Sequence, residues 1–244
     1  MNNTIENIIQ NEKSLCIEAT AGSGKTTLMI QRLMHILTQK NASPDQCLAI
    51  TFTEKAAKEM KERLIKELSN HSSIPSPYSI VQSMNVSTIH SYCLKLLRQH
   101  GLHIHVSPHR QIVTSIDLHQ RCKQAIQQLL IEFKFCPPKW LSTVLGTWSF
   151  QQLESILMTA YSQRSTIQYW LDNGFFNIQS DILKESEIFI ELFNGKLSHL
   201  KSCITHFLKI IDTNKQQYLW MDHDDILNYT YQLLSNVDWV RHDI

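Results

Sequence analysis

Apolar residues recur along the chain in two patterns, short continuous runs and longer stretches with helical spacing. The run Ser14–Ala19 leads directly into Thr20–Gly24, and Lys25–Leu37 then carries apolar residues at helical spacing. This order predicts a strand, a glycine-rich turn and a helix. A second cycle follows, with a buried strand expected at Cys47–Phe52 and an amphipathic helix at Ala56–Leu68. Two strands joined by a helix predict a parallel sheet.

The pattern changes in the second half of the chain. After a loop at His71–Tyr78, a third unit runs from a strand at Val86–Thr88 into a helix at Ser91–Gln99. From Asp117 to about Asp212 the spacing is helical throughout, which predicts an all-helical subdomain. A last helical run opens at Asp222–Asp225, where the helix dipole favours acidic residues, and continues through Leu234. The fold class is therefore α/β with an inserted helical part.

Composition and charge limit the classes of partner. The chain has 244 residues and is 43% hydrophobic, as expected of a core-forming globular protein. Its 23 basic and 22 acidic residues nearly cancel, so any contact with nucleic acid must come from a local groove rather than from a broad positive field. No apolar stretch approaches the roughly 20 residues that span a bilayer, and no signal-like segment opens the chain. We expect a soluble, cytoplasmic protein without a membrane partner.

Several groups of residues that could carry metal chemistry favour structural interpretations. The six cysteines include no CxxC pair, which indicates reduced thiols: Cys16, Cys47, Cys93, Cys122, Cys136 and Cys203. Four histidines lack an adjacent residue that would complete a zinc site: His100, His103, His105 and His109. Three tryptophans lie in apolar company at helical spacing and are expected in the core: Trp140, Trp148 and Trp170. Asp224 and Asp225 are expected to support a helix start rather than to hold a metal.

The strongest chemical signal is the segment Ala19–Thr26, whose sequence ATAGSGKT is typical of a phosphate-binding loop between a strand and a helix. Glycines let the backbone curl so that successive N–H groups point at one phosphate, and the helix N-terminus adds partial positive charge. Lys25 would reach the β- and γ-phosphates, and Thr26 would bind Mg²⁺ through its hydroxyl. The general pattern begins with glycine where this chain has Ala19, and the alternative is a tight turn followed by an incidental lysine. The residues expected to bind ATP are Ala19, Thr20, Ala21, Gly22, Ser23, Gly24, Lys25, Thr26 and Thr27, with Lys25 and Thr26 catalytic.

Two further segments carry a family resemblance. Thr51–Arg63, TFTEKAAKEMKER, resembles motif Ia of the UvrD-like superfamily 1 DNA helicases, and Thr88–Arg98, TIHSYCLKLLR, resembles their motif Ib. Alanine at the head of the phosphate loop is also what this superfamily uses. The lead-in Glu18–Gly22 is most similar to the RecB/AddA branch, and Asp222–Leu227 resembles its DFDDLL element, with His223 in place of the usual Phe. The resemblance is nearest to the AddA-type helicases of double-strand break repair.

The resemblance implies a RecA-like P-loop NTPase core at residues 1–105, a helical insertion subdomain at 106–215 and a return to the core at 216–244. It implies an ATP-dependent DNA helicase, an ATP hydrolase that translocates on single-stranded DNA in repair or recombination. Its partners would be single-stranded DNA, the second RecA-like domain of the helicase and a nuclease subunit. Carried onto this chain, the residues implied to bind DNA are Phe52, Thr53, Lys55, Thr88 and His90.

Elementary chemistry agrees with that assignment. Strands that end at the carboxyl edge of a parallel sheet place hydroxyl groups and the Phe52 ring where such folds bind ligands. Hydroxyls can hold phosphates, and an aromatic face can stack on a base for roughly 1 to 3 kcal/mol. The alternatives are core packing for Phe52 and a solvated helix start for Lys55.

The family's acidic DExQD element, which holds Mg²⁺ and activates water, does not occur in the 244 residues. The position of the family's adenine-sensing glutamine falls near Thr4. We therefore expect this chain by itself to be inactive as an ATP hydrolase, as a segment that stops before the DExQD element. Two interpretations stay open, a trimmed helicase and an inactive remnant that binds nucleotide or DNA without turnover. Motifs Ia and Ib argue against a third, an unrelated P-loop kinase.

Overall fold

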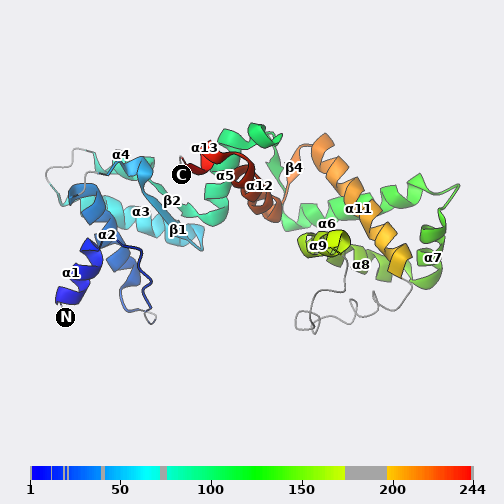
Figure 1. The fold of residues 1–244 in the computed structure, drawn as a ribbon, viewed down its shortest axis with the longest axis horizontal. Helices are drawn as coiled ribbons and strands as arrows, with labels where there is room; N and C mark the ends of the chain where they lie inside the picture. The colour runs from blue at the N-terminus through cyan, green and yellow to red at the C-terminus, as the bar shows by residue number, and fades with distance from the viewer. Residues whose placement is uncertain are drawn as a thin grey trace. The chain divides into compact units, whose positions relative to one another are not determined.

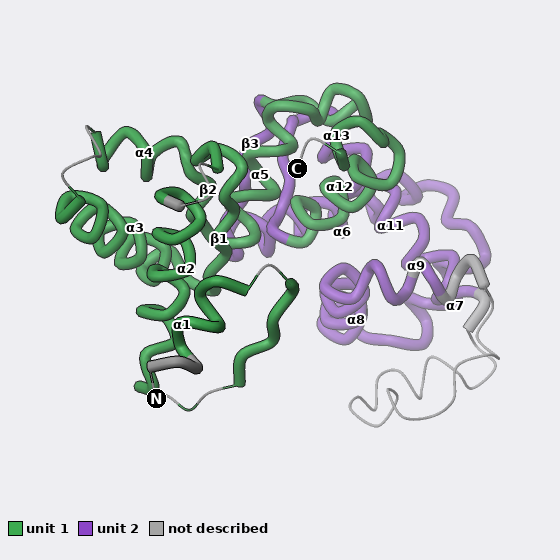
Figure 2. Tube along the Cα trace, turned by 60° about the vertical axis from the view of Figure 1, so that its left-hand side comes forward, with its two compact units in different colours: residues 1–108, 224–244 green, residues 109–223 purple. Residues whose placement is uncertain are grey.

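The computed structural model contains two compact units, residues 1–108 with 224–244 and residues 109–223 (Figure 2). The sequence-based boundaries at 105/106 and 215/216 stay a prediction of domain organisation. Within the described part of the chain, no helix is long and apolar enough to cross a membrane. The structure describes residues 2–11, 13–18, 20, 22–39, 42–71, 76–173 and 197–242.

The first unit contains two parallel strands, β1 (Leu48–Thr51) and β2 (Asn85–Thr88), drawn in light blue and cyan in Figure 1. This pairing confirms the expected parallel sheet, although the sheet is small. The helical elements of the unit are α1 (Asn2–Gln10), α2 (Lys25–Gln39), η1 (Pro44–Gln46), α3 (Glu54–Ser69), α4 (Pro77–Ser83), α5 (Ile89–His100), η2 (Gly101–Ile104), α12 (His223–Asn236) and α13 (Asp238–His242).

Capping side chains fix the starts of the two helices that follow the strands. The hydroxyl of Thr53 accepts a hydrogen bond of 3.1 Å from the backbone N–H of Ala56, and α3 therefore begins at Glu54. Thr88 is the N-cap of α5, and its hydroxyl accepts a hydrogen bond of 3.3 Å from the backbone N–H of Ser91. The sequence pattern placed both helices correctly but began them two residues late, because hydrophobic spacing does not reveal a cap.

The core of the first unit lies between the strands and the helices α2, α3 and α4. It is built from buried apolar side chains on these elements or directly beside them: Ile30, Leu33, Met34, Cys47, Ala49, Met60, Leu64, Leu68, Val81, Met84 and Val86. Alternate residues of β1, Leu48 and Ile50, remain exposed on the opposite face of the sheet. The expectation that the strand is buried throughout is therefore wrong for these two residues.

The expected strand at Ser14–Ala19 is also wrong. Residues 14–18 form no strand, and the side chains of Leu15 and Ile17 are 41% and 43% exposed. A short apolar run becomes a strand only when a neighbouring strand satisfies its backbone groups. The two strands described in this unit pair with each other and not with this segment.

The last part of the chain packs against α5 and η2. The hydroxyl of Thr230, on α12, donates hydrogen bonds to the carbonyl oxygens of Ile226 at 2.8 Å and Cys93 at 3.4 Å. On α13, the ring of Trp239 lies edge-on to the rings of His100 and His103, with centroid distances of 5.3 Å in both pairs. These contacts join α12 and α13 to α5 and η2 within the first unit.

The second unit is helical, as the sequence predicts, with one pair of very short parallel strands. The strands are β3 (Gln111–Ile112) and β4 (Trp220–Met221). The helices are α6 (Ser115–Glu132), α7 (Lys139–Thr147), α8 (Phe150–Ser162), α9 (Arg164–Asn173) and α11 (Leu197–Gln217). Trp140 and Trp148 pack at the border of the apolar core of this unit, partly buried. The side chain of Trp170 lies outside the described residues.

A charged cluster is buried at one end of the second unit. Asp222 accepts a hydrogen bond of 2.7 Å from Arg164 and another from the hydroxyl of Tyr161. Arg110 donates to the carbonyl oxygens of Trp220 at 3.2 Å and Lys215 at 3.5 Å. The cluster therefore fixes β4 to α8, α9 and α11.

Candidate functional site

The phosphate-loop segment adopts the backbone conformation that its glycines permit. Gly22 and Gly24 have φ values of 77° and 88°, which residues with a Cβ rarely adopt. A Cβ built at either glycine would have no heavy atom within 4 Å, so both face open space. The helix α2 begins immediately after them, at Lys25. Ala19 and Ala21 lie outside the described residues.

The carbonyl oxygen of Thr20 holds the loop together. It accepts a hydrogen bond from the ammonium group of Lys25 and one of 2.7 Å from the hydroxyl of Ser23. The backbone N–H of Ser23 also points to it, at 3.4 Å. Lys25, Thr26 and Thr27 are exposed. The ammonium group of Lys25 therefore lies at the loop and is open to solvent.

These residues fit a phosphate group. Glycines with positive φ, an exposed lysine and the N-terminus of a 15-residue helix together supply donors and positive charge on one side of the loop. The exposed hydroxyl of Thr26 is of the oxygen type that Mg²⁺ prefers.

The second candidate site lies where β1 and β2 end. In the register of the two strands Thr51 lies beside Thr88, which brings the segments after them to the same edge of the sheet. The hydroxyl of Thr51 donates a hydrogen bond of 3.1 Å to the carbonyl oxygen of Thr53, across the residue between them. That residue, Phe52, is fully exposed. Core packing, the alternative interpretation of Phe52, is therefore wrong.

Glu54 connects the two segments at this edge. Its Oε1 accepts hydrogen bonds of 2.7 Å from the hydroxyl of Thr88 and 2.7 Å from the hydroxyl of Ser91. These bonds stabilise the ionised carboxyl, so Ser91 first and then Thr88 lower the pKa of Glu54 below its usual value. Thr88 itself is buried, and its hydroxyl is held by this contact.

The other predicted DNA-binding residues lie on the first turns of the same two helices. Thr53 is the exposed N-cap of α3, Lys55 is exposed on its first turn, and His90 is half-buried on the first turn of α5. The structure therefore brings all five predicted residues to the helix starts that follow two paired strands. Sequence reasoning missed Glu54 and Ser91. A carboxylate directly after a capping threonine was the available signal, but its partner Thr88 lies 34 residues away.

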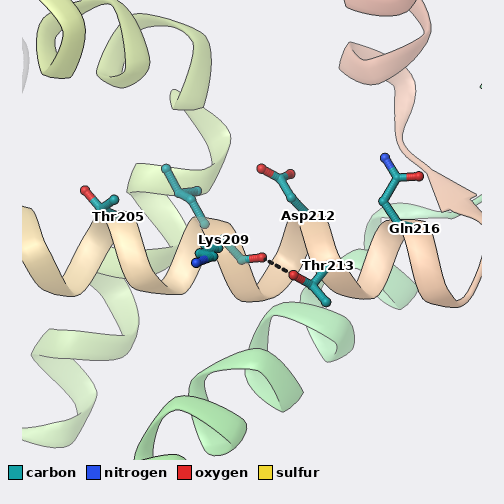
Figure 3. Close-up of a pocket in the computed structure, with 6 residues that line it drawn as sticks. Thr205, Lys209, Asp212, Thr213 and Gln216 are labelled. Atoms are coloured by element: carbon teal, nitrogen blue, oxygen red, sulfur yellow. Dashed lines mark hydrogen bonds between the residues drawn. The ribbon is translucent and has the colours of Figure 1, made fainter. Parts of the chain in front are cut away.

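A hollow on the surface of the second unit does not contribute to either site. It has a volume of about 360 Å³ and is lined by one side of α11, with Thr205, Lys209, Asp212 and Gln216 along it (Figure 3). The hydroxyl of Thr213 donates a hydrogen bond of 2.9 Å to the carbonyl oxygen of Lys209, within the helix. A single helix face offers no group converging from a second element, so we assign no chemistry to this hollow.

Comparison with known proteins shows the family of the chain and relatives that are named as helicases. The family model of the UvrD/REP helicase N-terminal domain matches residues 1–244. A probable DNA helicase II homolog of Mycoplasma capricolum is 38% identical over 51% of this chain and 16% of its own length. The ATP-dependent DNA helicase PcrA of Staphylococcus aureus is 34% identical over 85% of this chain and 29% of its length.

A third relative carries a different kind of name. It is an ATP-dependent helicase/nuclease subunit from Natranaerobius thermophilus, which is 24% identical over 95% of this chain and 20% of its length. The names of the three relatives cover more than one branch, so the AddA type is one of several similar groups. The chain spans between 16% and 29% of the length of these relatives.

Proposed function

We propose that this chain, which belongs to the UvrD/REP helicase N-terminal domain family, is the nucleotide-binding and part of the DNA-binding portion of an ATP-dependent DNA helicase. In this proposal the first unit is the beginning of a RecA-like core, and the whole protein moves along single-stranded DNA in repair or recombination. Its further partners are a second RecA-like domain and, in an AddA-type protein, a nuclease subunit.

The nucleotide role falls to the loop Thr20–Thr27. Lys25 contacts the β- and γ-phosphates of ATP, the backbone N–H groups at the start of α2 hold the same phosphates, and Thr26 supplies a hydroxyl to Mg²⁺. When bound, Mg²⁺ neutralises charge on the phosphate oxygens. The conformation of Gly22 and Gly24 supports this role because it leaves the cradle open.

The DNA role falls to the segments after β1 and β2. The observation that carries it is the fully exposed ring of Phe52, directly after Thr51, which pairs with the buried cap Thr88 in the parallel strands. Bases of single-stranded DNA stack on exposed aromatic rings, and Phe52 presents such a ring at this edge of the strand pair. Thr53, Lys55 and His90 then lie where phosphates and sugars of the same strand can reach them.

Fluorescence anisotropy with a single-stranded oligonucleotide tests the DNA role. Phe52→Ala is expected to weaken binding roughly 5- to 100-fold, as loss of one stacked base predicts. The matched control is Phe135→Ala, because Phe135 is also a surface aromatic, 94% exposed, but lies in the second unit. The net charge of +1 predicts few phosphate contacts and a shallow dependence on salt. Equal affinity of both variants and the unchanged chain would overturn the assignment of Phe52.

A further inference from the structure

We propose that Glu54 is a positioning residue for the DNA-binding segments, fixing the turn that carries Phe52 to the N-terminus of α5. The inference rests on the proposed function, because it gives Glu54 a task at the edge where DNA is proposed to bind.

The geometry makes Glu54 a bridge between two parts of the chain. It is the first residue of α3, directly after the cap Thr53 and two residues after Phe52. Its single oxygen Oε1 accepts from Thr88 and Ser91, both at 2.7 Å, and these two hydroxyls lie 3.0 Å from each other. One carboxylate thereby joins the start of α3 to Thr88 and Ser91, which lie 34 and 37 residues further along the chain.

The bridge continues from the hydroxyl groups into the backbone of α5. Thr88 is the N-cap of this helix, and the same hydroxyl that donates to Glu54 accepts from the backbone N–H of Ser91. A carboxylate at the N-terminus of a helix is also favoured by the helix dipole. Glu54 therefore adds to the pairing of β1 and β2 a side-chain link between the first turn of α5, with His90, and the turn that carries Phe52.

The negative charge of Glu54 by itself would not favour DNA binding. A negative group at a surface proposed to bind DNA repels the phosphates, so a carboxylate exposed there weakens binding unless it has another effect. Glu54 accepts hydrogen bonds from two hydroxyls at once, and this positioning of the two segments is the favourable effect that we propose. Because the two properties act in opposite directions, substitutions that remove one or both can separate them.

The experiment compares Glu54→Ala and Glu54→Gln in the full 244-residue chain by anisotropy with single-stranded DNA. The alanine variant loses the bridge and is expected to bind roughly tenfold more weakly, as loss of hydrogen bonds to a charged group predicts. The glutamine variant keeps an acceptor oxygen and loses the charge, so its affinity is expected to equal or exceed that of the unchanged chain. Glu62→Ala, which removes another exposed carboxylate from α3, is the matched control and is expected to bind at least as well as the unchanged chain.

A second single variant tests the inference even if Glu54→Ala fails to fold, and a double-mutant cycle tests it if that variant folds. Ser91→Ala removes one of the two donors to Glu54 and is expected to cause a smaller loss than Glu54→Ala. If Glu54 acts by positioning Phe52, then Phe52→Ala combined with Glu54→Ala is expected to cost less than the sum of the two single effects. Additive losses of DNA affinity in the double variant would overturn the inference but not the proposed function. The same holds if Glu54→Ala binds DNA like the unchanged chain while Phe52→Ala binds it more weakly. Absence of DNA binding by the unchanged chain would overturn the proposed function and the inference together.

Discussion

The guanidinium group of Arg164 donates a hydrogen bond of 2.7 Å from Nη2 to Oδ1 of Asp222, 58 residues further along the chain. The hydroxyl of Tyr161 donates to the other carboxylate oxygen of Asp222. The side chains of Arg164 and Asp222 are only 14% and 7% exposed, so the pair is largely shielded from water. It ties the end of β4 to α8 and α9.

Removal of one member of this pair should destabilise the chain strongly. Arg164→Ala removes one member of this largely buried ion pair, and breaking a buried pair typically costs about 3 to 5 kcal/mol. Urea denaturation followed by circular dichroism measures the loss. The control is Arg241→Ala, which breaks an exposed pair with Asp238 of 2.8 Å and is expected to cost less than about 1 kcal/mol. Similar losses for the two variants would contradict the role given to the buried pair.

Thiol labelling should separate the six cysteines by burial. All six are free, and Cys16 and Cys136 are exposed whereas the other four are buried. Burial raises the pKa of Cys122 to about 11 and that of Cys203 to about 12, so neither forms the reactive thiolate at neutral pH. We expect two fast-reacting thiols in the native chain at pH 8 and six in urea, as measured by reaction with a chromogenic disulfide.

The same thiols give stability a dependence on alkaline pH. A thiol in the unfolded chain ionises near pH 8.5, well below the pKa of Cys122 and Cys203 in the folded chain. Their contribution to stability is complete below about pH 8.5 and is lost as the pH rises toward 11 to 12. Replacement of Cys203 by Ala is expected to reduce this alkaline loss. Rapid labelling of Cys203 in the native chain would contradict its burial.

The loop glycines should be needed for their backbone conformation rather than for space. Gly24 has a φ of 88° and open space around the position of a Cβ, so Gly24→Ala meets no steric neighbour but strains the backbone by about 1 to 2 kcal/mol. We expect weaker binding of a fluorescent ATP analogue by this variant. Gly146→Ala is the control, because Gly146 lies within α7 with open space and an ordinary φ, where alanine favours the helix. Unchanged binding by the Gly24 variant would show that the observed conformation is not required.

Local patterns predicted α2, α3, α5, α12 and the helical character of the second unit, because these helices bury apolar side chains at regular spacing, but they did not predict α1, α4 or α13. The turn at Gly22 and Gly24 also follows from a local pattern, since the two glycines and Lys25 lie within four residues, and phosphate binding there stays a prediction. The strand expected at Ser14–Ala19 was wrong because strand formation depends on a neighbour, which an apolar run of six residues does not encode.

The sequence patterns could not predict contacts between residues that lie far apart in the sequence. Glu54 and Thr88 meet only because β1 and β2 pair in the register that sets Thr51 beside Thr88. Arg164 and Asp222 likewise meet only after α9 and β4 are in place. Phe52 was assigned to DNA by resemblance, and its exposure removes the core alternative without testing the DNA contact.

The central claim, that the loop at Gly22–Thr26 binds nucleotide, is tested most directly by titrating the 244-residue chain with a fluorescent ATP analogue and Mg²⁺. The account predicts saturable binding of micromolar or weaker affinity that is lost in Lys25→Ala, because Lys25 supplies the side-chain charge at the loop. Lys13→Ala, which removes an exposed lysine outside the loop, is expected to bind like the unchanged chain. Identical titration curves for the unchanged chain and Lys25→Ala would contradict the claim.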